Sequence, residues 1–263
     1  MDIDVARVLE LRDRVRSYRD RDRAACARDD RLAPAGVAFL RPYLEPGTRV
    51  LDVGCGDGGS LLESAGLIQE GVGIDTDPLH LALAEENRAR LGVGNVRFLR
   101  CDCLDLPAAF EAESFDVVFS ELGPLVDSWR HVQAALHVLR PDGLVFMAET
   151  RRSASTEWRE WTAGGLVHRP PSGFVASEDR ASTLLLLNGV DVRICARLAR
   201  RQVYPDVYEW LLARFAGWGP DVAVDDRFLR HLRDFIDAYV EPDGSIAVTE
   251  QQWWVGGVKR SGR

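Results

Sequence analysis

Apolar residues in the middle of the chain gather in short runs that alternate with helical patterns. Five runs have the length and apolar content of buried strands; they span Arg49–Val53, Gly71–Ile74, Val96–Leu99, Phe115–Phe119 and Leu144–Ala148. Between the runs, apolar residues recur every three to four positions, which is the spacing of a helix with one buried face. Strands that alternate with helices of this length predict an α/β fold with a parallel, doubly wound sheet.

Local signals predict where several helices begin and end. Asp77 is expected to cap a helix that starts at Pro78 and stops before Gly92. The residues expected on its buried face are Leu79, Leu83 and Leu91. Other helices are predicted over residues 2–30, at Ala35–Tyr43, at Ser60–Ile68 and from Asp127 or Ser128 onward.

The pattern is less regular after Glu149. Residues 151–176 carry tryptophan, glycine and proline and predict an inserted excursion. A helix at Glu178–Leu187, a strand at Val190–Leu198, helices at 206–217 and 226–240, and a long last strand within Ser245–Val258 are expected to follow. We predict a single domain over 1–263, with a core at 36–150, helical lid segments at 1–35, 151–176 and 204–240, and the last strand at 245–258.

The composition narrows the class of protein. A chain of 263 residues with 46% apolar residues can bury about 70% of its unfolded surface. No apolar run approaches the ~20 residues of a membrane span, and the amino terminus lacks an apolar signal segment, which predicts a cytoplasmic protein with no membrane partner. The net charge of −8, without a basic run free of acids, disfavours a nucleic-acid partner.

Lysine and cysteine usage excludes some chemistry. Lys259, near the carboxyl end, is the only lysine, so a buried catalytic lysine is nearly excluded. The five cysteines form no C-x-x-C pair, which disfavours disulfides and a cysteine-based metal site. Cys101 and Cys103 are expected to behave as small apolar residues at a strand end.

The segment after the first predicted strand carries the most specific signal. Val50–Ser60 reads VLDVGCGDGGS, a strand that runs into spaced glycines and then opens a helix. Glycines and the free amides of a helix start bring backbone close to a ligand. Gly54-x-Gly56-x-x-Gly59 satisfies a dinucleotide fingerprint, and Asp75 stands where a ribose-binding acid would follow. On its own, this segment is compatible both with a dinucleotide ligand and with another ligand that contains a nucleoside.

Three further features separate these ligands. Asp52 places an anion beside the turn, which disfavours a diphosphate and favours a cation. Asp102 ends the third predicted strand, where a carboxylate is suited to accept a hydrogen bond from an exocyclic amine. The segment Leu139-Arg-Pro-Asp-Gly143 joins the helix after the fourth strand to the fifth strand.

With these segments the sequence resembles the class I S-adenosylmethionine-dependent methyltransferases over about residues 38–150. It looks most similar to the branch that includes ubiquinone- and menaquinone-biosynthesis enzymes and other small-molecule methyltransferases. The matching segments are Val50–Gly58, Gly71–Asp75, Phe98–Leu106, Phe115–Phe119 and Leu139–Phe146. The resemblance implies a Rossmann-like sheet of seven strands in the order 3-2-1-4-5-7-6, with Ser245–Val258 as the antiparallel seventh strand.

The resemblance also implies a cofactor, S-adenosylmethionine, which leaves as S-adenosylhomocysteine, and no metal. Gly54, Cys55 and Gly56 would approach its methionyl part. Asp52 would help to hold the ammonium group. Asp75 would accept the ribose hydroxyls.

The remaining cofactor residues follow from the same resemblance. Thr76 would lie beside the adenine, whose edge Asp102 and the backbone of Cys103 would recognise. Glu121 and Leu122 would border the methionine tail and the methyl group.

Methyl transfer is an in-line displacement in which the protein mainly aligns the reactants and excludes water. A general base is needed only for a hydroxyl or carbon acceptor, and His168 is the candidate, whereas His80 is expected on the surface. Tyr18, Trp129 and Tyr204 are candidates to line the pocket of a small-molecule acceptor. We expect a monomer or a homodimer.

Two alternatives stay open because a fold does not by itself define an activity. The chain could be a non-catalytic module that binds S-adenosylmethionine and regulates a partner. An NAD-dependent oxidoreductase would need a Tyr/Lys or His dyad and a glycine fingerprint close to the chain start, and neither is found in the sequence.

Overall fold

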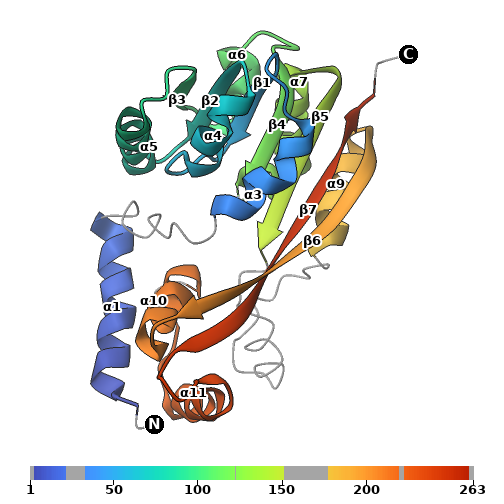
Figure 1. Cartoon of the computed structure of the whole chain (residues 1–263). Helices are drawn as coiled ribbons and strands as arrows, with labels where there is room; N and C mark the ends of the chain where they lie inside the picture. The colour runs from blue at the N-terminus through green and yellow to red at the C-terminus, as the bar shows by residue number, and fades with distance from the viewer. Residues whose placement is uncertain (1–2, 22–32, 122, 151–176, 219–221, 261–263) are drawn as a thin grey trace. The chain divides into compact units, whose positions relative to one another are not determined.

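Figure 1 shows a computed structural model of the chain, which describes residues 3–21, 33–121, 123–150, 177–218 and 222–260. Its seven-stranded sheet has the order β3-β2-β1-β4-β5-β7-β6, which confirms the predicted order. The chain divides into two compact units, described here in turn. The strands are β1 Arg49–Val53, β2 Glu70–Asp75, β3 Val96–Arg100, β4 Phe115–Glu121, β5 Leu139–Thr150, β6 Val190–Tyr204 and β7 Ile246–Lys259.

The first unit is built on the parallel part of the sheet. β1 lies between β2 and β4, and β3 and β5 extend the sheet in parallel on either side. The arrow of β7 runs opposite to those of its neighbours β5 and β6 in Figure 1, as expected. The carboxyl ends of β1, β2, β3 and β4 therefore meet at one edge, which is where parallel α/β sheets place their ligands.

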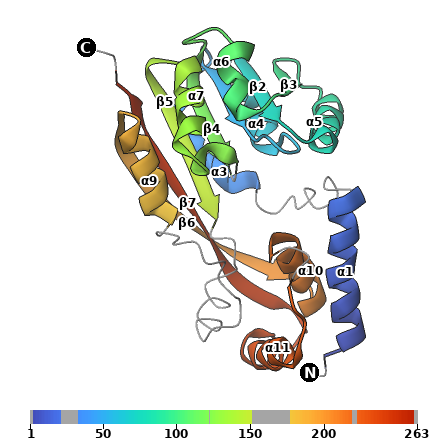
Figure 2. The same cartoon turned by 180° about the vertical axis from the view of Figure 1, so that it is seen from behind.

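Helices cover both faces of this sheet. One face carries α3 (Ala33–Leu40), α4 (Gly59–Ser64) and α5 (Pro78–Leu91), over a core that includes Leu61 and Phe146. The other face, seen from behind in Figure 2, carries α6 (Leu106–Ala109), α7 (Trp129–Val138) and α9 (Ser177–Leu187). The structure thus confirms a doubly wound α/β fold. Short 3-10 turns are η1 (Arg41–Tyr43), η2 (Ala65–Leu67), η3 (Cys103–Asp105) and η4 (Pro124–Val126).

The ends of α5 follow the predicted signals, but its buried face does not. The Asp77 carboxylate caps the helix by accepting a hydrogen bond from the amide of Leu79 at 3.0 Å. Leu83 is buried as expected, whereas Leu79 is 41% exposed and Leu91 is 53% exposed. Both exposed leucines lie in a terminal turn of the helix, while its middle covers β2 and β3. The predicted burial of these two residues is wrong.

Strand lengths depart from the prediction in two places. β5 begins at Leu139 rather than Leu144, because the expected turn is absorbed as an irregularity in which Asp142 adopts a φ of 59°. Its pairing with β4 shifts register before the regular pairs begin at Val117 and Leu144. β6 continues past Leu198 to Tyr204.

The second unit is helical. It contains α1 (Val5–Arg21), α10 (Val207–Trp218) and α11 (Asp226–Tyr239), with residues 199–204 of β6 and 246–252 of β7. Trp210 is fully buried and stacks on Phe235 with 4.7 Å between ring centroids, within the core of this unit. Among the helices that the structure describes, none has both the length and the apolar character needed to cross a bilayer.

Candidate functional site

The loop after β1 is fastened to the neighbouring strand. The amides of Gly54 and Cys55 both donate to the carbonyl oxygen of Ile74 in β2, at 2.8 and 2.9 Å. The loop then passes through Gly56 and Gly58, with φ of 55° and 78°, before α4 begins. Positive φ at these positions is what glycine tolerates and other residues resist.

The two glycines differ in what surrounds them. A Cβ on Gly58 would overlap the ring of Phe98, so this position is closed by packing within the fold. A Cβ on Gly56 would have no described atom within 4 Å. The backbone at Gly56 therefore borders open space at the carboxyl edge of the sheet, where a ligand can approach it.

Asp75, at the end of β2, holds the loop from the other side. Its Oδ2 accepts the amide of Gly56 at 3.0 Å, and its Oδ1 accepts the amide of Asp77 at 2.9 Å. Burial raises the pKa of Asp75, but the nearby imidazole of His80 and the hydrogen bonds from the amides of Asp77 and Gly56 outweigh it, so the pKa lies below its ordinary value. Asp75 is a carboxylate at neutral pH and is available to accept further hydroxyl donors.

His80 is placed differently from the prediction. The sequence predicts a surface histidine at the start of α5, but its side chain is 25% exposed and its Nδ1 lies 3.7 Å from Oδ2 of Asp75. The facing carboxylate of Asp75 raises the pKa of His80, against the opposing effect of burial. His80 lies one helical turn beyond Asp77, which caps α5, so its side chain points back toward the end of β2. The short spacing between Asp75 and His80 could have indicated this contact.

Asp52 is the buried acid of this edge. It lies in β1 with 3% of its surface exposed. Burial raises its pKa well above the ordinary value, and the nearby charges of Glu121, Asp75 and Asp57 raise it further. Four acids therefore concentrate negative potential beside the glycine loop.

Glu121, at the end of β4, joins this group through a contact that the sequence did not indicate. The hydroxyl of Ser60, in the first turn of α4, donates to Oε2 of Glu121 at 2.7 Å. Its neighbour Leu122 lies outside the described residues. The serine directly after the glycine loop was the available signal, because that position faces the ends of the adjacent strands.

Comparison with known proteins identifies the family. A family profile described as a methyltransferase domain matches residues 44–178, which is half of the chain. The chain belongs to the class I S-adenosylmethionine-dependent methyltransferases. The chain shares 36% identity over 156 residues with the nocamycin O-methyltransferase of Saccharothrix syringae, covering 52% of this chain and 54% of that protein.

A second curated relative is also named as an O-methyltransferase. The ubiquinone biosynthesis O-methyltransferase of Actinobacillus pleuropneumoniae is 32% identical over 112 residues, which cover 41% of this chain and 47% of that protein. The chain thus spans about half the length of the curated relatives it matches.

Solved structures agree on the fold. The YcgJ protein of Bacillus subtilis aligns with a TM-score of 0.60 at 20% identity, over 86% of this chain and 99% of that one. The [4+2]-cyclase SpnF aligns with a TM-score of 0.55 at 20% identity, over 86% of this chain and 79% of that one. These likenesses support the architecture alone.

Three more predicted cofactor residues lie near the same edge of the sheet. Thr76 is exposed at the end of β2. Asp102 is exposed after β3, where its carboxylate caps η3 by accepting the amide of Leu104 at 2.8 Å. Cys103 is buried, its thiol contacts the carbonyl oxygen of His131 at 3.6 Å, and burial raises its pKa to about 12. The prediction that Cys103 behaves as a small apolar residue is confirmed.

The predicted acceptor residues belong to different compact units. Trp129 begins α7 and is 48% exposed. Tyr204 is buried in the helical unit, and its hydroxyl accepts a hydrogen bond from Arg214 at 3.0 Å. Tyr18 lies in α1 but its side chain is outside the described part of the chain, as is His168.

Proposed function

We propose that this chain transfers a methyl group from S-adenosylmethionine to a small-molecule acceptor. The observation that carries the proposal is the grouping of acids at one edge of the sheet. Asp52, Asp75 and Glu121 come from β1, β2 and β4 and surround a glycine loop whose backbone at Gly56 is open.

The charge of this edge fits the cofactor. S-adenosylmethionine carries a sulfonium and an ammonium group, and both are stabilised by carboxylates held in a partly buried site. A diphosphate would instead meet the same acids with unfavourable charge. The open backbone at Gly56 gives room for the approach of a ligand without a side chain in between.

Each acid would have its own part in binding. Asp75 would accept the ribose hydroxyls while it continues to hold the amide of Gly56. Glu121, oriented by the hydroxyl of Ser60, would bind the ammonium group together with Asp52. The loop from Gly54 through Cys55 to Gly56 would contact the methionyl part through its backbone.

The adenine would be recognised after β3. Asp102 would accept a hydrogen bond from the exocyclic amine, and the backbone of Cys103 would contact the ring edge, with Thr76 beside it. Glu121 and Leu122 would border the methyl group. These assignments agree with the exposure of Asp102 and Thr76 at the carboxyl edge of the sheet.

When bound, the cofactor supplies an electrophilic methyl carbon. The chain's own residues then have to hold the acceptor in line with that carbon and keep water out. A hydroxyl acceptor must also lose a proton, for which His168 is the proposed base. Tyr18 and Trp129 are the proposed contacts to the acceptor, whereas Tyr204 is buried and is not proposed for this role.

The curated relatives support a small organic acceptor with a reacting oxygen. Two of them are named as O-methyltransferases, one for nocamycin and one for ubiquinone biosynthesis. These names concern different acceptors, so they support the reaction class more than any one substrate. No nucleic-acid partner is proposed, in keeping with the net charge of −8.

A labelled-methyl assay tests this function. The full chain is incubated with S-adenosylmethionine labelled on the methyl group and a panel of phenols, enols, carboxylates and amines, and label and S-adenosylhomocysteine are followed together. Transfer to an acceptor, with equimolar S-adenosylhomocysteine, is expected. Cofactor binding without transfer to any member of a broad panel would favour the non-catalytic module instead.

A further inference from the structure

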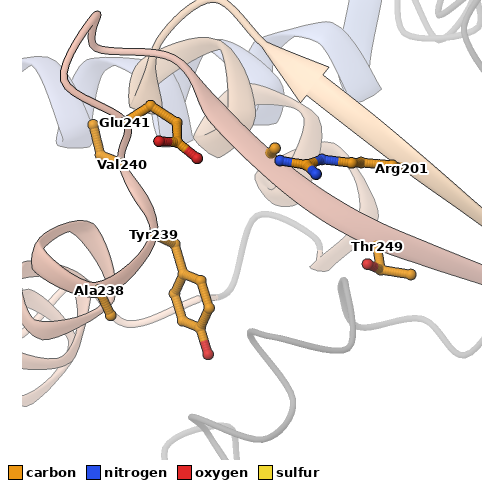
Figure 3. Close-up of a pocket in the computed structure, with 7 residues that line it drawn as sticks. Arg201, Ala238, Tyr239, Val240, Glu241 and Thr249 are labelled. Carbon is orange, nitrogen blue, oxygen red and sulfur yellow. The ribbon is translucent and has the colours of Figure 1, made fainter.

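The helical unit holds a pocket that lies outside the residues assigned above. It has a volume of about 280 Å³, close to the lower end of the range for small-molecule sites. Three elements line it, as Figure 3 shows: β6, the end of α11, and β7. The lining residues are Arg201, Ala238, Tyr239, Val240, Glu241, Ala247 and Thr249.

Two opposite charges face this space. In Figure 3 the guanidinium of Arg201 and the carboxylate of Glu241 extend toward one another from different elements. Among the described residues, neither side chain forms a hydrogen bond or a salt bridge with another residue. The pocket therefore offers a cation and an anion that the rest of the described fold does not use.

The remaining polar groups complete this arrangement. Thr249 contributes a hydroxyl on the side of Arg201, and Tyr239 contributes an aromatic ring on the side of Glu241. The ring of Tyr239 packs against Phe235, with 4.9 Å between centroids, and Phe235 is fully buried. An aromatic face held in place next to a carboxylate is a favourable environment for an ammonium group.

We propose that this pocket binds a small bipolar molecule of the amino-acid type, with its carboxylate on Arg201 and its ammonium group between Glu241 and Tyr239. A singly charged molecule would satisfy one of the two groups and be repelled by the other. A ligand with both charges matches both, and the pocket volume suits a molecule of that size. The site rests on the helical unit alone and does not depend on the proposed methyl transfer.

Binding of straight-chain amino acids to the full chain tests this site. β-Alanine, γ-aminobutyrate and longer homologues are titrated by ligand-observed nuclear magnetic resonance, with butyrate and butylamine as singly charged analogues. One amino acid of the series is expected to bind at least about tenfold more tightly than either analogue, the difference of one charge-assisted hydrogen bond. Arg201→Gln and Glu241→Gln should each weaken its binding by about tenfold or more.

Matched variants control for charge and folding. Arg233→Gln and Asp234→Asn remove one charge of each sign from exposed positions of α11 outside the pocket, and they should leave binding unchanged. Thermal melting of every variant checks that the helical unit is folded. The proposal is overturned if no amino acid binds, if butyrate binds as tightly, or if folded Arg201→Gln and Glu241→Gln variants bind like the unchanged chain. Cofactor affinity, measured in parallel, reports separately on the proposed function.

Discussion

The amide of Gly56 donates a hydrogen bond to the carboxylate of Asp75 over 3.0 Å, and this contact joins the loop after β1 to the end of β2. The other oxygen of the same carboxylate accepts the amide of Asp77, which caps α5. One acid thus orders both the glycine loop and the start of a helix. The proposed ribose site is formed by a group that the fold already holds in place.

Replacing Asp75 by asparagine should weaken the binding of S-adenosylmethionine by roughly tenfold to a hundredfold, or about 1.5–3 kcal/mol. The substitution keeps the shape of the side chain but removes the charge that the hydroxyl donors and His80 require. Isothermal titration calorimetry measures the change. Glu86→Gln, at an exposed position of α5, is the matched control and should bind normally. Equal affinity for both variants would show that Asp75 does not hold the ribose.

Replacing each of three glycines by alanine separates the effect of backbone strain on stability from the effect of ligand contact on binding. Gly56, Gly58 and Gly189 all have positive φ, so each Gly→Ala variant should lose about 1–2 kcal/mol of unfolding free energy from backbone strain. Gly58→Ala should lose more, because its Cβ would overlap Phe98. Gly56→Ala should bind cofactor far more weakly than Gly189→Ala, whose site is equally open but lies before β6. Denaturant unfolding and calorimetry measure the two effects, and similar cofactor affinity in both variants would contradict the account.

The stability of the fold should fall as pH rises because of Asp52. Its pKa is raised, first by burial, above the ordinary value of 3.8, so between these two values the native state holds a proton that the unfolded chain has released. Asp52→Asn removes this titration. The variant should be more stable than the unchanged chain above the raised pKa, and the difference should shrink as pH falls toward 3.8. Urea unfolding across a pH series measures it, and parallel curves would refute the assignment.

His80 should also make the stability of the fold fall as pH rises, but through the loss of a stabilising contact. The neighbouring carboxylate of Asp75 raises the pKa of His80 above 6.5, so the stabilisation is complete below the ordinary pKa and is lost as pH rises through the raised pKa. His80→Gln should therefore destabilise the fold in mildly acidic solution and have little effect in alkaline solution. His137→Gln, at an exposed position of α7, should change stability little at either pH. A His80→Gln effect that does not vary with pH would indicate packing rather than charge.

Much of the sheet and of the glycine loop after β1 could be predicted because the sequence signals for them are local. Asp77, Pro78 and Gly92 fix the ends of α5 through capping and backbone preference, and the glycines after Asp52 mark the ligand loop. Asp52, Asp75 and Glu121 could be placed at one edge because parallel strands end together.

The misplaced residues depend on contacts between distant segments. Burial of Leu79 and Leu91 depends on how far α5 extends past the sheet. The helical spacing of apolar residues in the sequence gives no information about that extension. Ser60 reaches Glu121 across 61 positions of sequence. The contact of His80 with Asp75 is the local exception, and the short spacing between the two residues could have indicated it.

Calorimetry of the full chain with S-adenosylmethionine, S-adenosylhomocysteine and NAD tests the central claim most directly. The acids beside the glycine loop should bind both sulfur nucleosides, which share the ammonium group, and reject the diphosphate of NAD. Tight binding of NAD, with no heat from either sulfur nucleoside, would contradict the account.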